Sequence, residues 1–447
     1  MNSALHPSPQ PTPLGPRIAI VGSGIAGLYT AWALSQRLPQ AQLHVFEAGD
    51  HWGGHTDTHR LVQPEGPPVA VDTGFIVFNR LNYPLFSAML DQLGVTAQAS
   101  DMSFSVADHV HGLTYNPSKQ WSLLARPQNF ARPEFRQMLR DLWRFYQTLQ
   151  HCPAETIPIQ QTLSDYLERH GYSQAFHELH LYPMCGALWS ASHLQTAALP
   201  LRFVVQFMQH HRMLQVRERP QWLTVRGGSQ QYVQAIRQQC PQIHWHPLAV
   251  QQVRRQSTDA GLRVQVRTAA QLFDMDEVVL ACHADDALKL LAQPSIQEQQ
   301  VLGALGYSDN RMVLHSDPAY MPRQRHQWAS WHVRIDRGTT QPCYSITYWM
   351  NRLQALPTRT PFLATLNPSA DIDPRRVRVE RAYRHPRFDV AALQAQGRWS
   401  RINAQAGVSF AGAYWGWGFH EDGARSAERV VQALYARYHT ALLDRHP

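Results

Sequence analysis

The segment RIAIVGSGIAGLYTAWALSQRLPQAQLHVFEAGDHWGGHT, residues 17–56, decides the fold of this chain. Residues 18–21 are apolar and predict a buried strand, which the sequence GSGIAG at 22–27 follows directly. Residues 28–38 then have the apolar spacing of a helix, and residues 42–46 predict a second strand. This order predicts a βαβ unit whose helix starts at a glycine-rich turn.

The glycines of the turn and the acid after the second strand indicate what this unit binds. Gly22, Gly24 and Gly27 allow a tight turn and a close approach of the backbone to a pyrophosphate. The free N–H groups at the helix start would then bind that anion. Glu47 ends the second strand, can accept hydrogen bonds from both hydroxyls of a ribose, and would repel a 2′-phosphate. The sequence therefore predicts a dinucleotide site of the Rossmann type.

A second pair of glycines, Gly53 and Gly54, would let the chain fold back over the pyrophosphate. The pair resembles the GG element of the flavin amine oxidase and phytoene desaturase superfamily, in which an arginine usually follows. Here His55 follows, so the resemblance implies a weaker or pH-dependent contact with the pyrophosphate. The sequence VDTGFIVFN at 71–79 resembles the D-x-G segment of the same superfamily, which runs beside the flavin ring. The resemblance therefore implies FAD as the cofactor.

Later segments resemble further cofactor elements of this superfamily. Gly227-Gly228 precedes a predicted helix, and IHWHPLAVQQV at 243–253 resembles the strand that reaches the adenine half of the cofactor. DMDEVVLACHADDALKLL at 274–291 predicts an apolar strand that ends at Ala281. GVSFAGAYWGWGFHEDGARSAERVVQAL at 407–434 resembles the last element, a strand, an aromatic crossing and a helix that starts at the flavin. This segment contains no cysteine, so FAD is expected to bind non-covalently.

The superfamily's motifs imply a set of cofactor-binding positions spread over the whole chain. They are Gly22, Ser23, Gly24, Ile25, Ala26, Gly27, Glu47, Ala48, Gly53, Gly54, His55, Thr56, Thr73, Gly74, Phe75, Ile76, Val250, Ala281, Gly412, Phe419 and His420.

These positions imply an α/β protein in which two domains are interleaved. A Rossmann-like FAD-binding domain of the amine oxidase type is expected to alternate along the chain with a substrate domain built from a mixed sheet and helices. The FAD-binding pieces are predicted at 17–115, 220–290 and 405–440, the substrate pieces at 116–219 and 291–404, and a loose Pro-rich tail at 1–16.

The sequence His420-Glu421-Asp422 by itself allows a metal site, an acid–base group or a structural role. Three adjacent residues cannot all point inward from one turn, so no metal site is expected. Glu421 or Asp422 is expected to cap the following helix, and Phe419 or His420 to offer a backbone N–H to the flavin. His420 and His283 are the catalytic candidates because imidazole titrates near neutrality, and a structural role stays open for each.

Aromatic residues alternate along strand-like runs between 311 and 368 and predict a sheet that forms one wall of a substrate cavity, or a sheet face simply filled by aromatic rings. The residues predicted to line the cavity are Tyr182, Met184, Cys185, Trp189, Trp328, Tyr348 and Trp415. Residues 135–149 have amphipathic helical spacing, and residues 199–219 are apolar and then basic. Each segment could pack in the core or lie on anionic lipid.

Shorter motifs, among them YPMCGALWS at 182–190 and GFHEDG at 418–423, resemble a bacterial subgroup often encoded beside cyclopropane-fatty-acid synthases. That resemblance implies a fatty-acyl or phospholipid substrate and a lipid-modifying enzyme as partner. Simple amine oxidation is the first alternative, but Arg311 stands where many amine oxidases have a lysine, and Phe419 replaces a tyrosine of their aromatic cage. A non-redox lipid-binding role with a structural FAD is the second alternative.

Composition limits the remaining classes of function. The net charge is +8, and because Lys119 and Lys289 are the only lysines, nearly all of the basic charge is arginine. This charge reflects either composition bias or attraction to an acidic partner such as anionic lipid. No nucleic-acid motif is found, and the five separated cysteines argue against a metal ribbon or an iron–sulfur cluster and fit a reducing compartment. We therefore expect a cytoplasmic protein and leave open a peripheral contact with the inner membrane face.

Overall fold

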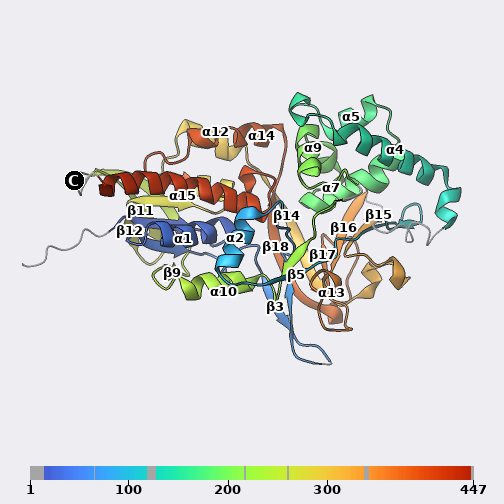
Figure 1. Ribbon diagram of the computed structural model, residues 1–447, viewed down its shortest axis with the longest axis horizontal. Coiled ribbons are helices and arrows are strands. Elements are labelled where there is room, and N and C mark those ends of the chain that lie inside the picture. The colour runs from blue at the N-terminus through green and yellow to red at the C-terminus, as the bar shows by residue number, and fades with distance from the viewer. Residues whose placement is uncertain are drawn as a thin grey trace, which may run out of the picture.

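A computed structural model describes residues 15–64, 66–117, 127–215, 218–258, 261–336 and 342–443. Two regions lie side by side along the long axis of the molecule (Figure 1). One is built on a five-stranded sheet in the order β19-β13-β1-β2-β9, and all four strand pairs are parallel. Its strands are β1 (Arg17–Val21), β2 (Gln42–Phe46), β9 (His244–His246), β13 (Glu277–Leu280) and β19 (Val408–Phe410).

Helices and a smaller sheet cover the two faces of this parallel sheet. Helices α1 (Ile25–Arg37) and α15 (His420–Leu443) pack against each other, and α2 (Pro84–Gln92) and α10 (Gln230–Gln239) belong to the same hydrophobic core. The other face packs on an antiparallel sheet of β10 (Val250–Thr258), β11 (Gly261–Thr268) and β12 (Leu272–Met275). Helices α11 (Ala284–Leu290), α12 (Ile296–Gly303) and α14 (Val390–Gln396) also contribute to this second core.

The second region is built on a mixed seven-stranded sheet in the order β18-β14-β17-β16-β15-β6-β7. Only β15 and β6 pair in parallel. Its strands are β6 (Phe104–Asp108), β7 (Leu113–Tyr115), β14 (Tyr307–His315), β15 (Trp331–Asp336), β16 (Cys343–Trp349), β17 (Leu363–Leu366) and β18 (Val377–Pro386). The helices packed with it are α4 (Pro133–Gln150), α5 (Leu163–Arg169), α6 (Gln174–Phe176), α7 (Tyr182–Trp189), α8 (His193–Ala197), α9 (Leu201–His210) and α13 (Met350–Leu353). Figure 1 shows α4, α5, α7 and α9 grouped over one side of this region.

Two short antiparallel pairs lie between the two regions. They are β3 (Thr58–Leu61) with β4 (Val69–Asp72), and β5 (Ala97–Ala99) with β8 (Leu223–Val225). The chain passes from one region to the other after β5, which leads to β6, and returns through β8, which lies between α9 and α10.

The sheets divide the chain differently from the predicted domain pieces. Strands β6 and β7 fall inside the piece predicted for the cofactor domain, 17–115, yet β6 pairs with β15 in the other sheet. Helices α12 and α14 fall inside the predicted substrate piece, 291–404, yet they pack on the core beside the parallel sheet. Such long-range pairings leave no mark in the local sequence pattern, so these boundaries are corrected by the structure.

The predicted tail lies almost entirely outside the described residues, whereas the two segments that could lie on lipid form helices packed in the core. Residues 1–14 are outside the described residues, and the Pro16 carbonyl already accepts a hydrogen bond from the Gln42 N–H. Helix α4 buries Phe135 and Phe145 in the core, and α9 buries most of its apolar side chains there. None of the helices that the structure describes combines the length and the apolar character needed to cross a bilayer.

Candidate functional site

A cavity of about 1330 Å³ joins the two regions. At one end it is lined by the glycine turn between β1 and α1 and by the residues that follow β2 and β13. At the other end it is lined by aromatic and aliphatic side chains from α4, α7, α9 and the seven-stranded sheet. We call these parts the dinucleotide end and the chamber.

The glycine turn at the dinucleotide end has the geometry that a bound pyrophosphate requires. Gly22 has a φ of +102°, which favours glycine, and a Cβ on Gly27 would lie 1.9 Å from the Gly22 carbonyl oxygen. A Cβ on Gly24, in contrast, would meet nothing within 4 Å and would project into open space. Helix α1 has no side-chain cap and no acid in its first turn, so its first N–H groups stay free for an anion. The residues present therefore fit a dinucleotide.

Glu47 ties the first glycine turn to the second. Its Oε2 accepts hydrogen bonds from the Ser23 N–H at 2.9 Å and the Ser23 hydroxyl at 2.5 Å, and its Oε1 accepts one from the Gly49 N–H at 2.8 Å. The Ser23 oxygen in turn accepts a hydrogen bond from the Gly53 N–H at 3.1 Å. A carboxylate oxygen can accept more than one hydrogen bond, so Glu47 also remains able to bind ribose hydroxyls.

Most positions predicted to bind the cofactor line this cavity, and three do not. The lining positions are Gly22, Ser23, Gly24, Ile25, Ala26, Glu47, Ala48, Gly54, His55, Thr73, Gly74, Phe75, Ile76, Val250, Ala281, Gly412, Phe419 and His420. Gly27 is used for close packing of α1 on the turn, and Gly53 for the contact with Ser23. Thr56 is buried, and its hydroxyl is hydrogen-bonded to Tyr232. These three support the cavity wall from behind.

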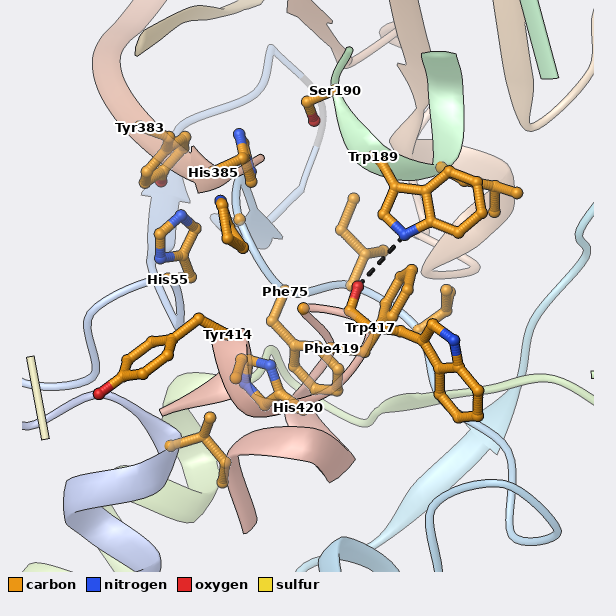
Figure 2. A pocket seen from close by; sticks show the side chains of 18 of the residues that line it. His55, Phe75, Trp189, Ser190, Tyr383, His385, Tyr414, Trp417, Phe419 and His420 are labelled. Atoms are coloured by element: carbon orange, nitrogen blue, oxygen red, sulfur yellow. Dashed lines mark hydrogen bonds between the residues drawn. The ribbon is translucent and has the colours of Figure 1, made fainter. Parts of the chain in front are cut away.

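His420 is the first residue of α15, and its ring lies flat on Phe75 with centroids 3.5 Å apart (Figure 2). Its Nε2 lies 3.2 Å from the Thr56 hydroxyl and 3.3 Å from the Tyr232 hydroxyl. Burial lowers the pKa of this imidazole to about 3. His420 is therefore a neutral, well-anchored ring at the cavity wall.

The two acids after His420 bind backbone N–H groups. Asp422 accepts a hydrogen bond from the Phe419 N–H at 3.0 Å, at the start of its own helix. Glu421 accepts from the N–H groups of Leu85 and Phe86, both at 3.0 Å, and so caps α2 rather than α15. Burial raises the pKa of each carboxyl to about 6. Asp422 thus has the capping role expected for one of the pair, and neither acid lines the cavity.

Three histidines and two tyrosines gather beside the second glycine pair. The ring of His55 lies 5.0 Å from that of Tyr383, 5.2 Å from His385 and 6.2 Å from His283, centroid to centroid. His283 in turn stacks on Tyr307 at 4.4 Å. Figure 2 shows His55, Tyr383 and His385 close together at the cavity wall.

Burial lowers the pKa of each histidine in this cluster. The His55 Nε2 is buried and has no hydrogen-bond partner within the described part of the chain, and burial together with the neighbouring imidazoles holds the pKa of His55 well below its usual value. Burial lowers the pKa of His385 to about 4 and also lowers that of His283. The sequence prediction included His55 and His283 but missed Tyr383 and His385. The one available signal was their spacing of two on a strand, which places both on one face.

His283 also belongs to a group of possible metal ligands with Asp285 and Asp286, whose ligand atoms all lie within 4.8 Å of one another. Both carboxylates are already paired, since Arg384 contacts Asp285 at 2.5 Å and Asp286 at 3.1 Å. Lys289 adds a second cation to the same two acids. Ion pairing accounts for this group without a metal.

The chamber contains only part of the residues predicted to line it. Met184, Trp189 and Tyr348 line it, and the Trp189 Nε1–H donates to the Trp417 carbonyl oxygen at 3.2 Å (Figure 2). Trp331, on the strand paired with that of Tyr348, also lines it. The aromatic strands therefore do form one wall.

Four of the residues predicted to line the chamber point elsewhere, and the predictions for them are wrong. Tyr182 packs edge-on against His193, and Cys185 is fully buried in the helical core. Trp328 donates its Nε1–H to the Pro322 carbonyl oxygen at 2.7 Å. Trp415 packs on the core beside the parallel sheet. Neighbouring aromatic residues in a helix or strand point to different sides, so membership of an aromatic motif did not decide which of them reach the cavity.

Other chamber residues come from elements that carry no recognisable motif. Helix α4 contributes Leu139, Leu142, Trp143 and Tyr146, and other lining residues are Met102, Phe104, His180, Phe207, His211, Met213, Trp222, Met312 and Phe388.

No lysine among the described residues lies at the chamber, whereas the exposed Arg219 lines its rim. Among the described residues that line the cavity, Lys289 is the one lysine, and it lies at the dinucleotide end with Asp285 and Asp286. Arg311, the residue at the expected lysine position, is exposed and paired with Glu380 at 3.0 Å. Lys119 lies outside the described residues. No ammonium group of the described chain therefore reaches the chamber.

Residues 20–93 match the family model of the NAD(P)-binding Rossmann-like domain. The whole chain resembles solved structures at low sequence identity. A candidate protoporphyrinogen oxidase from Exiguobacterium sp. 255-15 superposes with a TM-score of 0.67 at 16% identity, over 94% of this chain and 99% of the other. The chain has the fold of these proteins.

Two further structures show the same likeness. A fatty acid isomerase from P. acnes that produces CLA gives a TM-score of 0.65 at 14% identity, over 93% of this chain and 98% of the other. Cyclohexylamine oxidase from Brevibacterium oxydans gives 0.63 at 14% identity, over 95% and 99%. No curated protein sequence matches this chain. At these identities the likeness concerns the fold, and the named activities are too different from one another to indicate a substrate.

Proposed function

We propose that this protein is an FAD-dependent oxidoreductase that acts on an apolar substrate, a fatty-acyl or phospholipid molecule. The observation that carries the proposal is the single cavity that leads from a glycine turn fit for a pyrophosphate into an aromatic chamber. A cofactor that binds at the turn and reaches along this cavity would have its reactive end beside the chamber.

The residues that would hold FAD are those around the dinucleotide end. The first turn of α1 and Gly24 would bind the pyrophosphate, and Glu47 the ribose. The start of α15, at Phe419 and His420, would lie at the flavin, where the positive end of the helix favours negative charge. When bound, FAD supplies hydride transfer. The protein supplies placement, a dry cavity wall and the neutral imidazole of His420.

The chamber favours an apolar substrate over an amine. Its described walls hold no lysine, and His180 and His211 in these walls have their pKa values lowered to about 4 by burial. An apolar chain contacting Phe104, Met184 and Trp331 gains the usual free energy of burying apolar surface. Charged substrates would find few partners there.

The decisive experiment is anaerobic titration of the purified yellow protein with unsaturated and branched acyl lipids. Loss of the oxidised flavin's visible absorbance, with a product identified by mass spectrometry, is the expected result. An isomerisation would instead give a product without net loss of the oxidised flavin, so both readouts are needed. A Gly24→Ala variant, reconstituted in parallel, serves as the control for cofactor loading.

Two alternative outcomes would redirect the proposal. Reduction by cyclohexylamine or putrescine, but by no acyl lipid, would establish amine oxidation in its place. A flavin that stays oxidised with every substrate and changes no lipid, in a protein that nevertheless binds lipid, would establish the non-redox role.

The mouth of the chamber suits peripheral contact with anionic lipid. Trp143, 62% exposed, stands on α4 at the cavity rim, and Arg136 and Arg140 are exposed on the same helix. Neither arginine, nor the exposed Arg219 that lines the rim, has an acidic partner among the described residues. Flotation with phosphatidylglycerol vesicles, and not with phosphatidylcholine vesicles, is expected. A Trp143→Ala variant that floats as well as the wild type would argue against this contact.

A further inference from the structure

His180 is a buried polar residue in the apolar wall of the chamber. It lies in a turn of π-helix, His177–Leu181, between α6 and α7, and is only 3% exposed. Turns of this kind are frequent at functional sites. The rings around it are Phe104 at 6.4 Å, Tyr146 at 6.5 Å and Phe176 at 6.2 Å, centroid to centroid.

The hydrogen bonds of Tyr115 fix which nitrogen of His180 carries the proton. The Tyr115 hydroxyl donates its one hydrogen to the Leu179 carbonyl oxygen at 2.7 Å, because a carbonyl can only accept. The same hydroxyl oxygen lies 2.9 Å from the His180 Nδ1 and must therefore accept from an Nδ1–H. Burial also lowers the pKa of His180 to about 4, which keeps the ring neutral. A neutral imidazole with a proton on Nδ1 has a bare Nε2 that can only accept.

That Nε2 has no hydrogen-bond partner among the residues that the structure describes. Tyr146 does not supply one, since its hydroxyl contacts the Met184 sulfur at 4.0 Å. Tyr115 holds Nδ1 and does not line the chamber, whereas Phe104 and Tyr146, whose ring centroids lie 6.4 Å and 6.5 Å from that of His180, do line it. An acceptor left unpaired in an apolar site costs free energy that a ligand can recover.

We infer that the His180 Nε2 is the polar anchor of the chamber and accepts a hydrogen bond from a donor group on an otherwise apolar substrate. The inference rests on the proposed function of the chamber as a substrate site. The chemical class is an apolar molecule with an O–H or N–H group: an alcohol, a carboxylic acid in its neutral form, or an amine. An ionised carboxylate offers no hydrogen and would face the lone pair of Nε2, so it is excluded at this position.

The test compares two probes that differ in one hydrogen-bond donor, 1-dodecanol and its methyl ether. Binding is measured on the FAD-loaded protein by quenching of tryptophan fluorescence, since Trp189, Trp222 and Trp331 line the chamber. The alcohol is expected to bind about tenfold more tightly than the ether. In a His180→Phe variant both probes should bind equally.

Each outcome has a distinct meaning. If neither probe binds the wild-type protein, the proposed function of the chamber fails and the inference falls with it. If both probes bind equally well to the wild type, the chamber is a binding site for apolar molecules, but His180 does not accept a hydrogen bond from them. A further probe, ionised laurate, offers no donor hydrogen and should bind more weakly than 1-dodecanol.

Two further variants distinguish anchoring from a structural role. His177→Phe changes a histidine in the same π-helical turn that does not line the chamber, so the preference for the alcohol should persist. Tyr115→Phe removes the acceptor of the Nδ1–H and lets the imidazole carry its proton on either nitrogen. The ether should then bind more tightly than in the wild type, an effect that a loss of packing alone would not produce. An unchanged ratio in Tyr115→Phe would contradict the tautomer argument.

Discussion

The dinucleotide end and the chamber are parts of one cavity, but they are built in opposite ways. At the dinucleotide end, short continuous segments supply each contact: the turn at 22–27, Glu47 one residue beyond a strand, and the glycines at 53–54. In the chamber, the wall is assembled from side chains of several helices and strands that are distant in sequence, such as Tyr146 of α4, Met184 of α7 and Trp331 of β15. A site that binds its ligand through the backbone of short continuous segments can therefore be recognised in a sequence. A site whose walls depend on which way side chains point is determined by the packing of the helices and strands.

The sharpest way to break this comparison is to exchange glycine for alanine at two positions of the same turn. In Gly27→Ala the new methyl group would collide with the Gly22 carbonyl oxygen, 1.9 Å away, and the expected loss of stability is about 3 kcal/mol. In Gly24→Ala the methyl group meets open space, so stability should change by less than about 0.5 kcal/mol. FAD affinity should nevertheless fall roughly tenfold, because the methyl stands where the pyrophosphate would approach.

Urea unfolding of the apoproteins and FAD titration separate these two effects. Equal stability of the two variants would show that Gly24 and Gly27 are equally important for the packing of the turn.

The second largest effect concerns acid stability, to which histidines of both regions contribute. Seven of the described histidines have pKa values lowered to about 4 or below, chiefly by burial: His44, His180, His211, His315, His332, His385 and His420. The unfolded chain binds protons at these positions below its usual pKa of 6.5, and the folded protein does not. Stability is therefore retained above pH 6.5 and lost as the pH falls from 6.5 toward 4.

Three carboxyl groups act in the opposite direction. Asp72, Glu421 and Asp422 have pKa values raised to about 6, so the folded protein binds these protons first and gains stability as the pH falls from 6 toward 4. The three carboxyl groups offset the seven histidines only in part. The urea concentration at the midpoint of unfolding should therefore decrease as the pH is lowered from about 7 to about 5. His332→Phe should make this dependence less steep, whereas His326→Phe, at an exposed position, should not. A midpoint that rises on acidification would contradict the assignment.

Adjacent residues of α7 test the chamber itself. Met184 lines it, and Cys185 is buried behind it. Met184→Phe places a larger side chain in the cavity and should weaken 1-dodecanol binding about tenfold. Cys185→Ala should cost about 1 kcal/mol of stability and leave binding unchanged. If both variants changed 1-dodecanol binding and stability in the same way, the assignment of Met184 to the cavity and of Cys185 to the core would be wrong.

The smallest expected effect tests the substitution of His55 for the superfamily's usual arginine. The ring is neutral when the site is empty, because burial and the nearby His283, His385 and His420 hold its pKa down. A bound diphosphate would favour its protonated form, so FAD affinity should rise a few-fold as the pH falls from about 8 to about 6. His55→Phe should remove most of this dependence in fluorescence titrations. An unchanged slope would assign the effect to His283 or His385 instead.

Individual residues show how far the sequence could predict the candidate site. The positions around Gly24, Glu47 and Gly54 could be proposed together from the sequence because a turn, a strand end and a second turn follow one another in the chain, and all three line the cavity. Met184 was placed correctly and Cys185 was not, although both belong to one motif, since only the docking of α7 decides which of them faces the chamber. The sequence did not indicate His180, Tyr383 and His385, because the contacts that give them a role are made with residues distant in the chain.

By itself, the sequence determined the α/β class, the dinucleotide turn and the mixture of sheet and helices beyond it, because local spacing of glycines and apolar residues is enough to specify them. The tertiary structure alone decided that β6 and β7 join the seven-stranded sheet, that Glu421 caps α2, and that Tyr115 fixes the proton of His180. Each of these depends on groups brought together from distant parts of the chain. Their energies come from burial and directed hydrogen bonds, which exist only once the chain has folded.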